Sequence, residues 1–140
     1  MTWAEIGAVD HIGIAVASIA KALEFYEGAL GLAARPPEEV PTEQVRVAFL
    51  PVGETRLELL EPLSPESPVA RFISRRGEGI HHLCLRVGDL DAALQAVEAR
   101  GGEIIPPAPR VGAGGRRIAF IHPRSTGGVL IELKEYREPA

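Results

Sequence analysis

A short stretch that occurs twice constrains the fold of this 140-residue chain more than any other feature. Residues 10–16 read Asp-His-Ile-Gly-Ile-Ala-Val, and residues 81–87 read His-His-Leu-Cys-Leu-Arg-Val. Both stretches alternate along their length, as a strand with two different faces does, and both carry a histidine at their second position. Because His82 follows His11 at an offset of 71 residues, the chain predicts two equivalent strands that each bear a histidine.

Further residues match at the same offset, which indicates an internal duplication. The aligned pairs are Val16 with Val87, Ser18 with Asp89, Leu23 with Leu94, Gly31 with Gly102, and 47–49 with 118–120. After a turn that is three residues longer in the second copy, Glu58 meets Glu132. We therefore expect one domain over residues 1–140, with a first module at 8–62, a connector at 63–79 and a second module at 80–135.

Each module is expected to contain a strand, a helix and further strands, so the predicted fold class is α+β with two tandem βαβββ modules. Ser18 and Asp89 stand at helix N-cap positions, and the two helices are expected to end at Gly31 and at Gly101–Gly102. A connector helix is expected to begin at Ser67-Pro68 and to end at Gly77. The expected strands are 8–16, 45–50, 55–60, 82–87, 103–105, 117–122 and 129–134, with loops at 33–43 and 108–117.

Composition excludes several classes of partner and location. The net charge of −4 gives no basic field for nucleic acid or an anionic membrane, so any anionic ligand needs local arginines or a metal. The apolar segments are too short to span a membrane, and the N-terminus lacks the pattern of a signal peptide. Cys84 is the only cysteine, so no disulfide can form within the chain, and a cytoplasmic location is expected.

The repeated histidine and glutamate positions predict a metal site. Glu58 and Glu132 each interrupt an apolar strand, where a carboxylate is costly to bury unless it is paired or coordinated. Together with His11 and His82, they form a nitrogen and oxygen donor set that suits a divalent first-row ion. Water or substrate oxygens could complete an octahedron. Each of these residues, taken alone, has an alternative to metal binding. A glutamate on a strand can simply face solvent, and a histidine can have a structural role.

Three other residues with ligand chemistry are set aside. His81 should point to the opposite face of its strand from His82. His122 stands at a turn before Pro123 and lacks a partner in the repeat. Cys84 shares the His82 face, and we expect it to be a small buried residue.

Several stretches together resemble one family. They are 10–16, 58–62 (Glu-Leu-Leu-Glu-Pro), 67–72 (Ser-Pro-Val-Ala-Arg-Phe), 77–82 (Gly-Glu-Gly-Ile-His-His), 120–123 (Phe-Ile-His-Pro) and 127–133 (Gly-Gly-Val-Leu-Ile-Glu-Leu). The duplicated module resembles the vicinal oxygen chelate superfamily, which has the glyoxalase and bleomycin-resistance fold. Within it the chain resembles the methylmalonyl-CoA epimerase family from about residue 8 to 134.

The resemblance implies a fold, a cofactor and a reaction. In this family the modules form a cupped mixed sheet around a metal, whose ligands fall on His11, Glu58, His82 and Glu132. The ion is expected to be Co²⁺, with Mn²⁺, Ni²⁺ and Zn²⁺ as alternatives. The family interconverts the (2R) and (2S) epimers of methylmalonyl-CoA by a 1,1-proton transfer through a metal-stabilised enolate. A CoA thioester substrate and a homodimer are implied as well.

Inversion at carbon needs one proton carrier on each face of the substrate. The resemblance assigns Glu132 to one of them. Family members are proposed to use a carboxylate on the strand at 45–50 for the other, but the matching position here is Val47, which departs from that pattern. Glu43, just upstream, is our substitute, with a solvated loop charge as its alternative reading. Metal-bound water or Glu58 could also serve.

Binding of the CoA phosphates is assigned to Arg110, Arg116 and Arg117, which flank the glycine-rich stretch 111–115.

The competing functions are a glyoxalase I-type lyase acting on a thiol hemithioacetal and a metal-free small-molecule-binding protein of the same fold. A dioxygenase or fosfomycin-type transferase would use two histidines and one glutamate. The four intact ligand positions argue against the metal-free protein and against the dioxygenase or transferase. The long connector with Ser67-Pro68 and the motif at 127–133 favour the epimerase over the lyase.

Overall fold

The computed structural model of the chain describes residues 6–136. The chain divides into two compact units, and we describe each by itself. The N-terminal unit is His11–His81, and the C-terminal unit comprises the described residues up to Asp10 together with those from His82 onward. Strands β1 (Ile6–Ala15) and β5 (Gly79–Val87) each begin in one unit and end in the other. No helix among residues 6–136 is long and apolar enough to cross a membrane.

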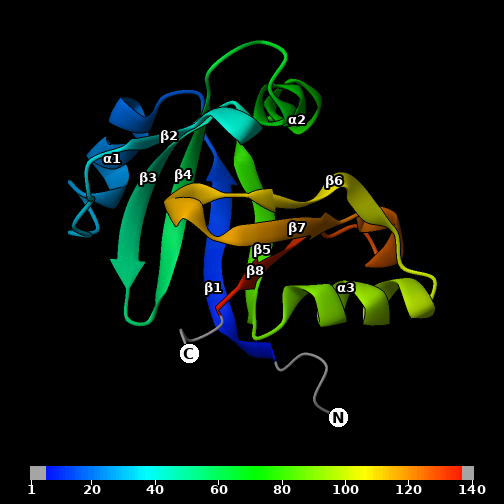
Figure 1. Cartoon of the computed structure of the whole chain (residues 1–140). Helices are drawn as coiled ribbons and strands as arrows, with labels where there is room; N and C mark the ends of the chain where they lie inside the picture. The colour runs from blue at the N-terminus through cyan, green and yellow to red at the C-terminus, as the bar shows by residue number, and fades with distance from the viewer. Residues whose placement is uncertain (1–5, 137–140) are drawn as a thin grey trace. The chain divides into compact units, whose positions relative to one another are not determined.

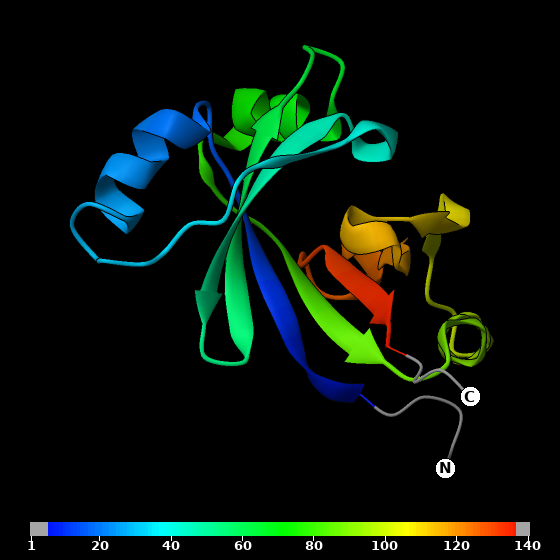
Figure 2. The same ribbon diagram turned by 60° about the vertical axis from the view of Figure 1, so that its left-hand side comes forward.

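The N-terminal unit holds a mixed sheet with the strand order β2-β3-β4-β1 (Figure 1). Its further elements are α1 (Ile19–Tyr26), β2 (Glu38–Val40), a 3₁₀ turn (Pro41–Glu43), β3 (Val45–Val52), β4 (Thr55–Pro62) and α2 (Pro68–Arg76). Strand β3 is antiparallel to β2 and β4, whereas β1 runs parallel to β4. Figure 2 shows the β3–β4 hairpin in green with β1 in blue beside it. Both α1 and α2 pack against β4.

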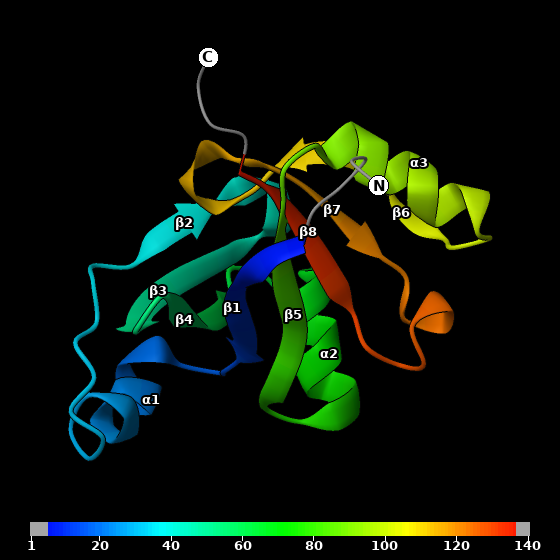
Figure 3. The ribbon, with the colours of Figure 1, turned by 90° about the horizontal axis from the view of Figure 1, so that it is seen from below.

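The C-terminal unit repeats this topology with the strand order β5-β8-β7-β6. Its further elements are α3 (Leu90–Ala99), β6 (Ile104–Val111), β7 (Arg117–Ile121), β8 (Ile131–Glu135) and 3₁₀ turns at Ala113–Gly115 and Pro123–Ser125. Strands β5 and β8 are parallel, and β7 is antiparallel to both β8 and β6. Figure 3 shows α3 beside β6 and β7, and α3 also packs against β8.

The predicted α+β fold class with two βαβββ modules is confirmed by this element order. Each unit has an apolar core in which one helix, α1 or α3, covers one face of the sheet. The two cores are Val16, Ile19, Ala48, Leu50 and Leu59 in the N-terminal unit, and Val87, Leu90, Ala93, Leu94, Ala119, Ile121 and Leu133 in the C-terminal unit. The alternation that predicted each strand therefore separates its core face from its other face. The exact module boundaries at 62 and 80 stay predictions.

All three predicted N-caps are confirmed. The side chain of Ser18 accepts a hydrogen bond from the Lys21 N–H, and that of Asp89 accepts one from the Ala92 N–H. Ser67 caps α2 by accepting from the N–H groups of Val69 and Ala70 at 3.1 and 3.3 Å.

Replacing Ser67 with alanine should lower the free energy of unfolding by about 1–2 kcal/mol, because a fully buried cap is lost and two backbone donors lose their acceptor. Urea denaturation measures this change. The control is Ser64→Ala, which removes an exposed hydroxyl that donates to the Gln44 side chain and should change stability by less than about 0.5 kcal/mol. Equal losses from both variants would contradict the special role of the buried cap.

The first helix is shorter than predicted, and the reason is local. It ends at Tyr26 rather than at Gly31 because the regular spacing of four residues is interrupted, as two of the following N–H groups reach back five residues. The N–H groups of Gly28 and Leu30 donate to the carbonyls of Leu23 and Phe25. A Cβ at Gly28 would lie 2.3 Å from the Glu24 carbonyl oxygen, so this wider turn requires glycine there.

Strand β6 is longer than the predicted strand 103–105 and takes in part of the predicted loop 108–117. It lies at the edge of its sheet, where prolines are tolerated because one side of the strand needs no ladder donors. Its pairing with β7 is irregular between Ile105 and Arg110, which is where the prolines stand.

Candidate functional site

The first predicted histidine and glutamate meet in the N-terminal unit. Because β1 and β4 are parallel neighbours, with Gly13 opposite Glu58, the His11 side chain reaches the glutamate. His11 Nδ1 lies 3.0 Å from Glu58 Oε2, and both residues are only 3% exposed. Arg56 Nε donates to the same carboxylate oxygen at 2.8 Å. The buried carboxylate therefore has the partners that its desolvation demands. We call His11 and Glu58 the first His–Glu pair.

The equivalent residues meet in the C-terminal unit. His82 Nε2 lies 2.9 Å from Glu132 Oε1, and both residues are 6% exposed. The His82 ring also packs edge-on against Phe120, with the ring centroids 5.9 Å apart. Phe120 stands opposite Glu132 in the β7–β8 ladder, as Phe49 stands opposite Glu58 in the β3–β4 ladder. We call His82 and Glu132 the second His–Glu pair.

The chemistry of these residues fits a metal. Each pair offers an imidazole nitrogen and a carboxylate oxygen, which are donors for divalent first-row ions, and each pair is buried from bulk water. The possible ligand atoms of His82 and Glu132 lie within 4.8 Å of each other. Each unit thus presents half of the predicted donor set on two neighbouring parallel strands. That all four residues bind one ion stays a prediction.

The three residues that were set aside take structural positions. His81 packs its ring against Phe72 of α2, with the centroids 5.0 Å apart, and so lies on the opposite face from His82, as predicted. His122 accepts the Arg124 N–H on its Nδ1 and so caps a 3₁₀ turn. Cys84 is fully buried, as expected.

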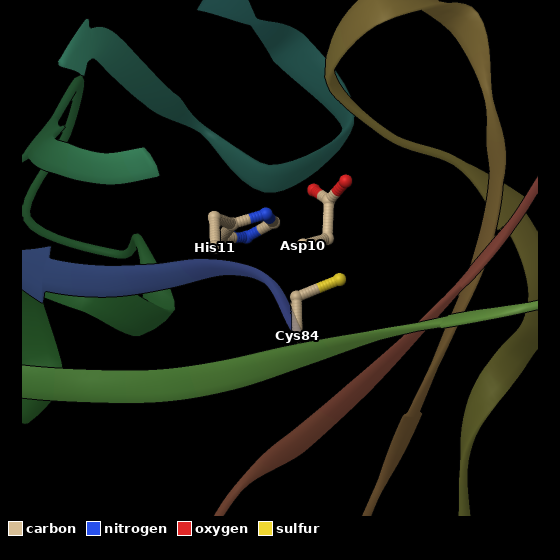
Figure 4. Close-up of side chains that lie close together, drawn as sticks. All are labelled: Asp10, His11 and Cys84. Atoms are coloured by element: carbon tan, nitrogen blue, oxygen red, sulfur yellow. The ribbon is translucent and has the colours of Figure 1, made fainter. Parts of the chain in front are cut away.

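The sequence reasoning missed a buried charge cluster around Asp10 in the C-terminal unit. Asp10 is fully buried and accepts from Arg86 Nε at 2.8 Å, with Lys134 Nζ at 3.5 Å. Figure 4 shows its carboxylate close to the Cys84 thiol. Arg86 and Lys134 face each other in the β5–β8 ladder. The available signal was that Arg86 interrupts an apolar run, between Leu85 and Val87, as the two glutamates do in their strands.

The candidates for the second proton carrier occupy different surroundings. Val47 is buried on β3 between Glu38 of β2 and Leu60 of β4, so that position offers no proton carrier. Glu43 ends the 3₁₀ turn, and one of its carboxylate oxygens is buried. The next residue, Gln44, fixes this turn to the segment after β4, because its carbonyl accepts the Leu63 N–H. Glu43 is therefore a half-buried carboxylate at a fixed turn.

The three predicted phosphate-binding arginines separate into two groups. The Arg110 guanidinium lies 4.8 Å above the Phe120 ring, which itself packs on His82. Arg116 stacks on Tyr136 at 4.1 Å, and Arg117 pairs with Asp91 at 2.9 Å and with Glu135 at 3.2 Å. The hydrogen bond to Asp91 raises the pKa of Arg117 above its ordinary value, and the Glu135 charge adds to this. Of the three, Arg110 is the one that the fold brings near the second His–Glu pair.

Comparison with known proteins agrees with this fold. The profile of the Glyoxalase/Bleomycin resistance protein/Dioxygenase superfamily matches residues 10–120. An uncharacterized protein, YqjC of Bacillus subtilis, is 48% identical over 91% of each chain. A methylmalonyl-CoA epimerase from Mycobacterium tuberculosis is 38% identical, with a TM-score of 0.89 over 96% of this chain and 90% of that one. A methylmalonyl-CoA epimerase solved with methylmalonyl-CoA and NH₄⁺ is 33% identical, with a TM-score of 0.89 over 96% of this chain and 100% of that one.

The resemblance predicted from the sequence motifs is thus confirmed by the family profile, by overall identity and by the solved structures. The chain belongs to the glyoxalase/bleomycin resistance protein/dioxygenase superfamily and, within it, to the methylmalonyl-CoA epimerases, which are isomerases.

Proposed function

We propose that this protein interconverts the (2R) and (2S) epimers of methylmalonyl-CoA by moving one proton at C2. The observation that carries the proposal is the pair of buried His–Glu contacts at repeat-equivalent positions of a methylmalonyl-CoA epimerase fold. We propose that His11, Glu58, His82 and Glu132 bind one divalent ion, with Co²⁺ first and Mn²⁺, Ni²⁺ or Zn²⁺ as alternatives. Such an ion would supply Lewis-acid stabilisation of the charge that develops on the thioester oxygen.

The chain's own residues have distinct tasks in this proposal. Glu132 moves a proton on one face of C2, because it is a buried carboxylate beside His82 on β8. Glu43 moves a proton on the other face, since it is a partly buried carboxylate at a fixed turn. Arg110 binds a CoA phosphate near the second His–Glu pair, and Arg116 and Arg117 contribute positive charge at the end of the loop that follows β6.

Two coarser properties belong to the proposal. We propose a cytoplasmic location. A chain with the single cysteine Cys84 forms no internal disulfide, and disulfides are typical of proteins in oxidising compartments. We also propose a homodimer, on the family resemblance alone.

Metal removal followed by an exchange assay tests the function. The protein stripped with a chelator should neither epimerise a single pure epimer of methylmalonyl-CoA in deuterated water nor incorporate deuterium at C2. Added Co²⁺ should restore both, and the measurement is chiral separation combined with mass spectrometry. If Co²⁺, Mn²⁺, Ni²⁺ and Zn²⁺ all fail to restore exchange, the proposal is wrong. A lyase would instead convert a thiol hemithioacetal, and a binding protein would turn over neither compound.

A further inference from the structure

The two His–Glu pairs are equivalent in the repeat, but their surroundings differ at one position. Two residues before Glu58 stands Arg56, and two residues before Glu132 stands Leu130. Because side chains two apart share one face of a strand, Arg56 lies on the Glu58 side of β4. The first pair therefore has a cation beside its carboxylate at a position where the second module has an apolar side chain.

The Arg56 side chain is held from two directions. Its Nε donates to Glu58 Oε2 at 2.8 Å, and its guanidinium carbon lies 5.2 Å from the centre of the Phe49 ring. It is 22% exposed, so solvent screens its charge only in part. In the parallel ladder its backbone stands opposite His11.

Both contacts of the Glu58 carboxylate fall on the same oxygen. Oε2 accepts from Arg56 and lies 3.0 Å from His11 Nδ1, which turns Oε1 away from both partners. The orientation of this carboxylate is thus fixed before any ligand binds. The positive charge of Arg56 also offsets the negative charge of Glu58 at the same place.

We infer that Arg56 is a positioning residue that acts through Glu58 by offsetting its charge, which lowers the affinity of the site for a divalent cation and leaves a bound cation more electrophilic. The inference rests on the proposed metal site. An uncompensated buried carboxylate attracts a cation strongly, whereas a carboxylate that already pairs with arginine attracts it less. A carboxylate that accepts a hydrogen bond from arginine also donates less charge to the ion, so more of the ion's charge remains for the substrate.

The sign of the effect separates this role from a structural one. Arg56→Met keeps an unbranched side chain against Phe49 but removes the charge, and it should tighten Co²⁺ binding about tenfold or more while lowering kcat. A merely structural arginine would, on removal, disorder Glu58 and weaken Co²⁺ binding. Arg56→Lys keeps the charge but not the planar donor, and its Co²⁺ affinity should stay within about threefold of the parent.

Isothermal titration of the stripped full-length protein with Co²⁺, followed by the epimerisation assay, measures both quantities. The matched control is Arg46→Met, which removes an arginine from the neighbouring strand β3 that pairs with Glu39 and Glu61, and its Co²⁺ affinity should change by less than about threefold. Unchanged or weaker binding by a folded Arg56→Met overturns the inference, and so does an Arg56→Lys affinity as far from the parent as that of Arg56→Met. If the parent itself binds no divalent ion, the proposed metal site fails instead.

Discussion

Replacing Glu132 with glutamine should lower kcat for epimerisation by about 10²–10⁴-fold, which is the usual contribution of a positioned general acid–base group. The amide keeps an oxygen near His82 but cannot carry the proton. Because only one face of C2 loses its carrier, deuterium should still enter from the other face. One pure epimer should therefore exchange its C2 proton without inverting, and the opposite epimer should do neither. Mass spectrometry and chiral separation of each epimer measure the two rates separately.

The mirror-image result is expected for Glu43→Gln if that residue serves the opposite face. The variant should fail to exchange the epimer that Glu132→Gln still exchanges. Metal content measured by elemental analysis is the control. Both variants should retain the ion, because Glu132→Gln keeps an oxygen donor and Glu43 is not one of the four proposed ligands. An epimerisation rate for Glu132→Gln within threefold of the parent would remove Glu132 from the mechanism. Normal exchange by Glu43→Gln would direct attention to Glu58 or to a water molecule as the second carrier.

Tight metal binding should be lost in His82→Ala and kept in His81→Ala, although the two histidines are adjacent. His82 is buried beside Glu132, whereas His81 packs on Phe72 on the other face of β5. Loss of one imidazole ligand should weaken Co²⁺ binding by at least about 10²-fold. Removing a residue that only hydrogen-bonds to a metal ligand already weakens metal binding by about 10–100-fold. Titration calorimetry on the stripped proteins measures the two affinities.

The His81→Ala variant serves as the matched control because it removes the same side chain from the neighbouring position. It should lose about 1 kcal/mol of stability with its ring contact to Phe72 and should retain the Co²⁺ affinity of the parent. Equal losses of affinity in both variants would mean that the assignment of strand faces to function is mistaken. The same would follow if only His81→Ala lost the ion.

Local patterns in the sequence predicted much of this fold because strand alternation and helix capping depend on residues only a few positions apart. Period-two alternation located the strands, and Ser18, Ser67 and Asp89 were recognisable as caps since a side-chain oxygen there meets free N–H groups. The internal repeat predicted that both units share one topology. It also predicted which histidine of the 81–82 pair lies with the glutamate.

Contacts set by strand register were out of reach. The contact of His11 with Glu58 depends on the pairing of β1 with β4, and the Asp10 cluster joins strands that are far apart in sequence. The end of α1 depends on a change in hydrogen-bond spacing at Gly28, which helix propensity does not encode. The extension of β6 through its prolines depends on its position at an edge, which is a property of the sheet.

The membership of Asp10 in the C-terminal unit has a consequence for folding during synthesis. The residues of the N-terminal unit emerge from the ribosome together and can pack as soon as His81 has left the exit tunnel. Asp10 is translated before all of them, yet Lys134, one of its cationic partners, lies 124 residues further along the chain. Until Lys134 has been synthesised this carboxylate therefore lacks one of its native partners, and the start of β1 is the last part of its strand to reach its native surroundings. The Asp10 cluster is therefore completed only at the end of synthesis, although Asp10 itself is among the first residues made.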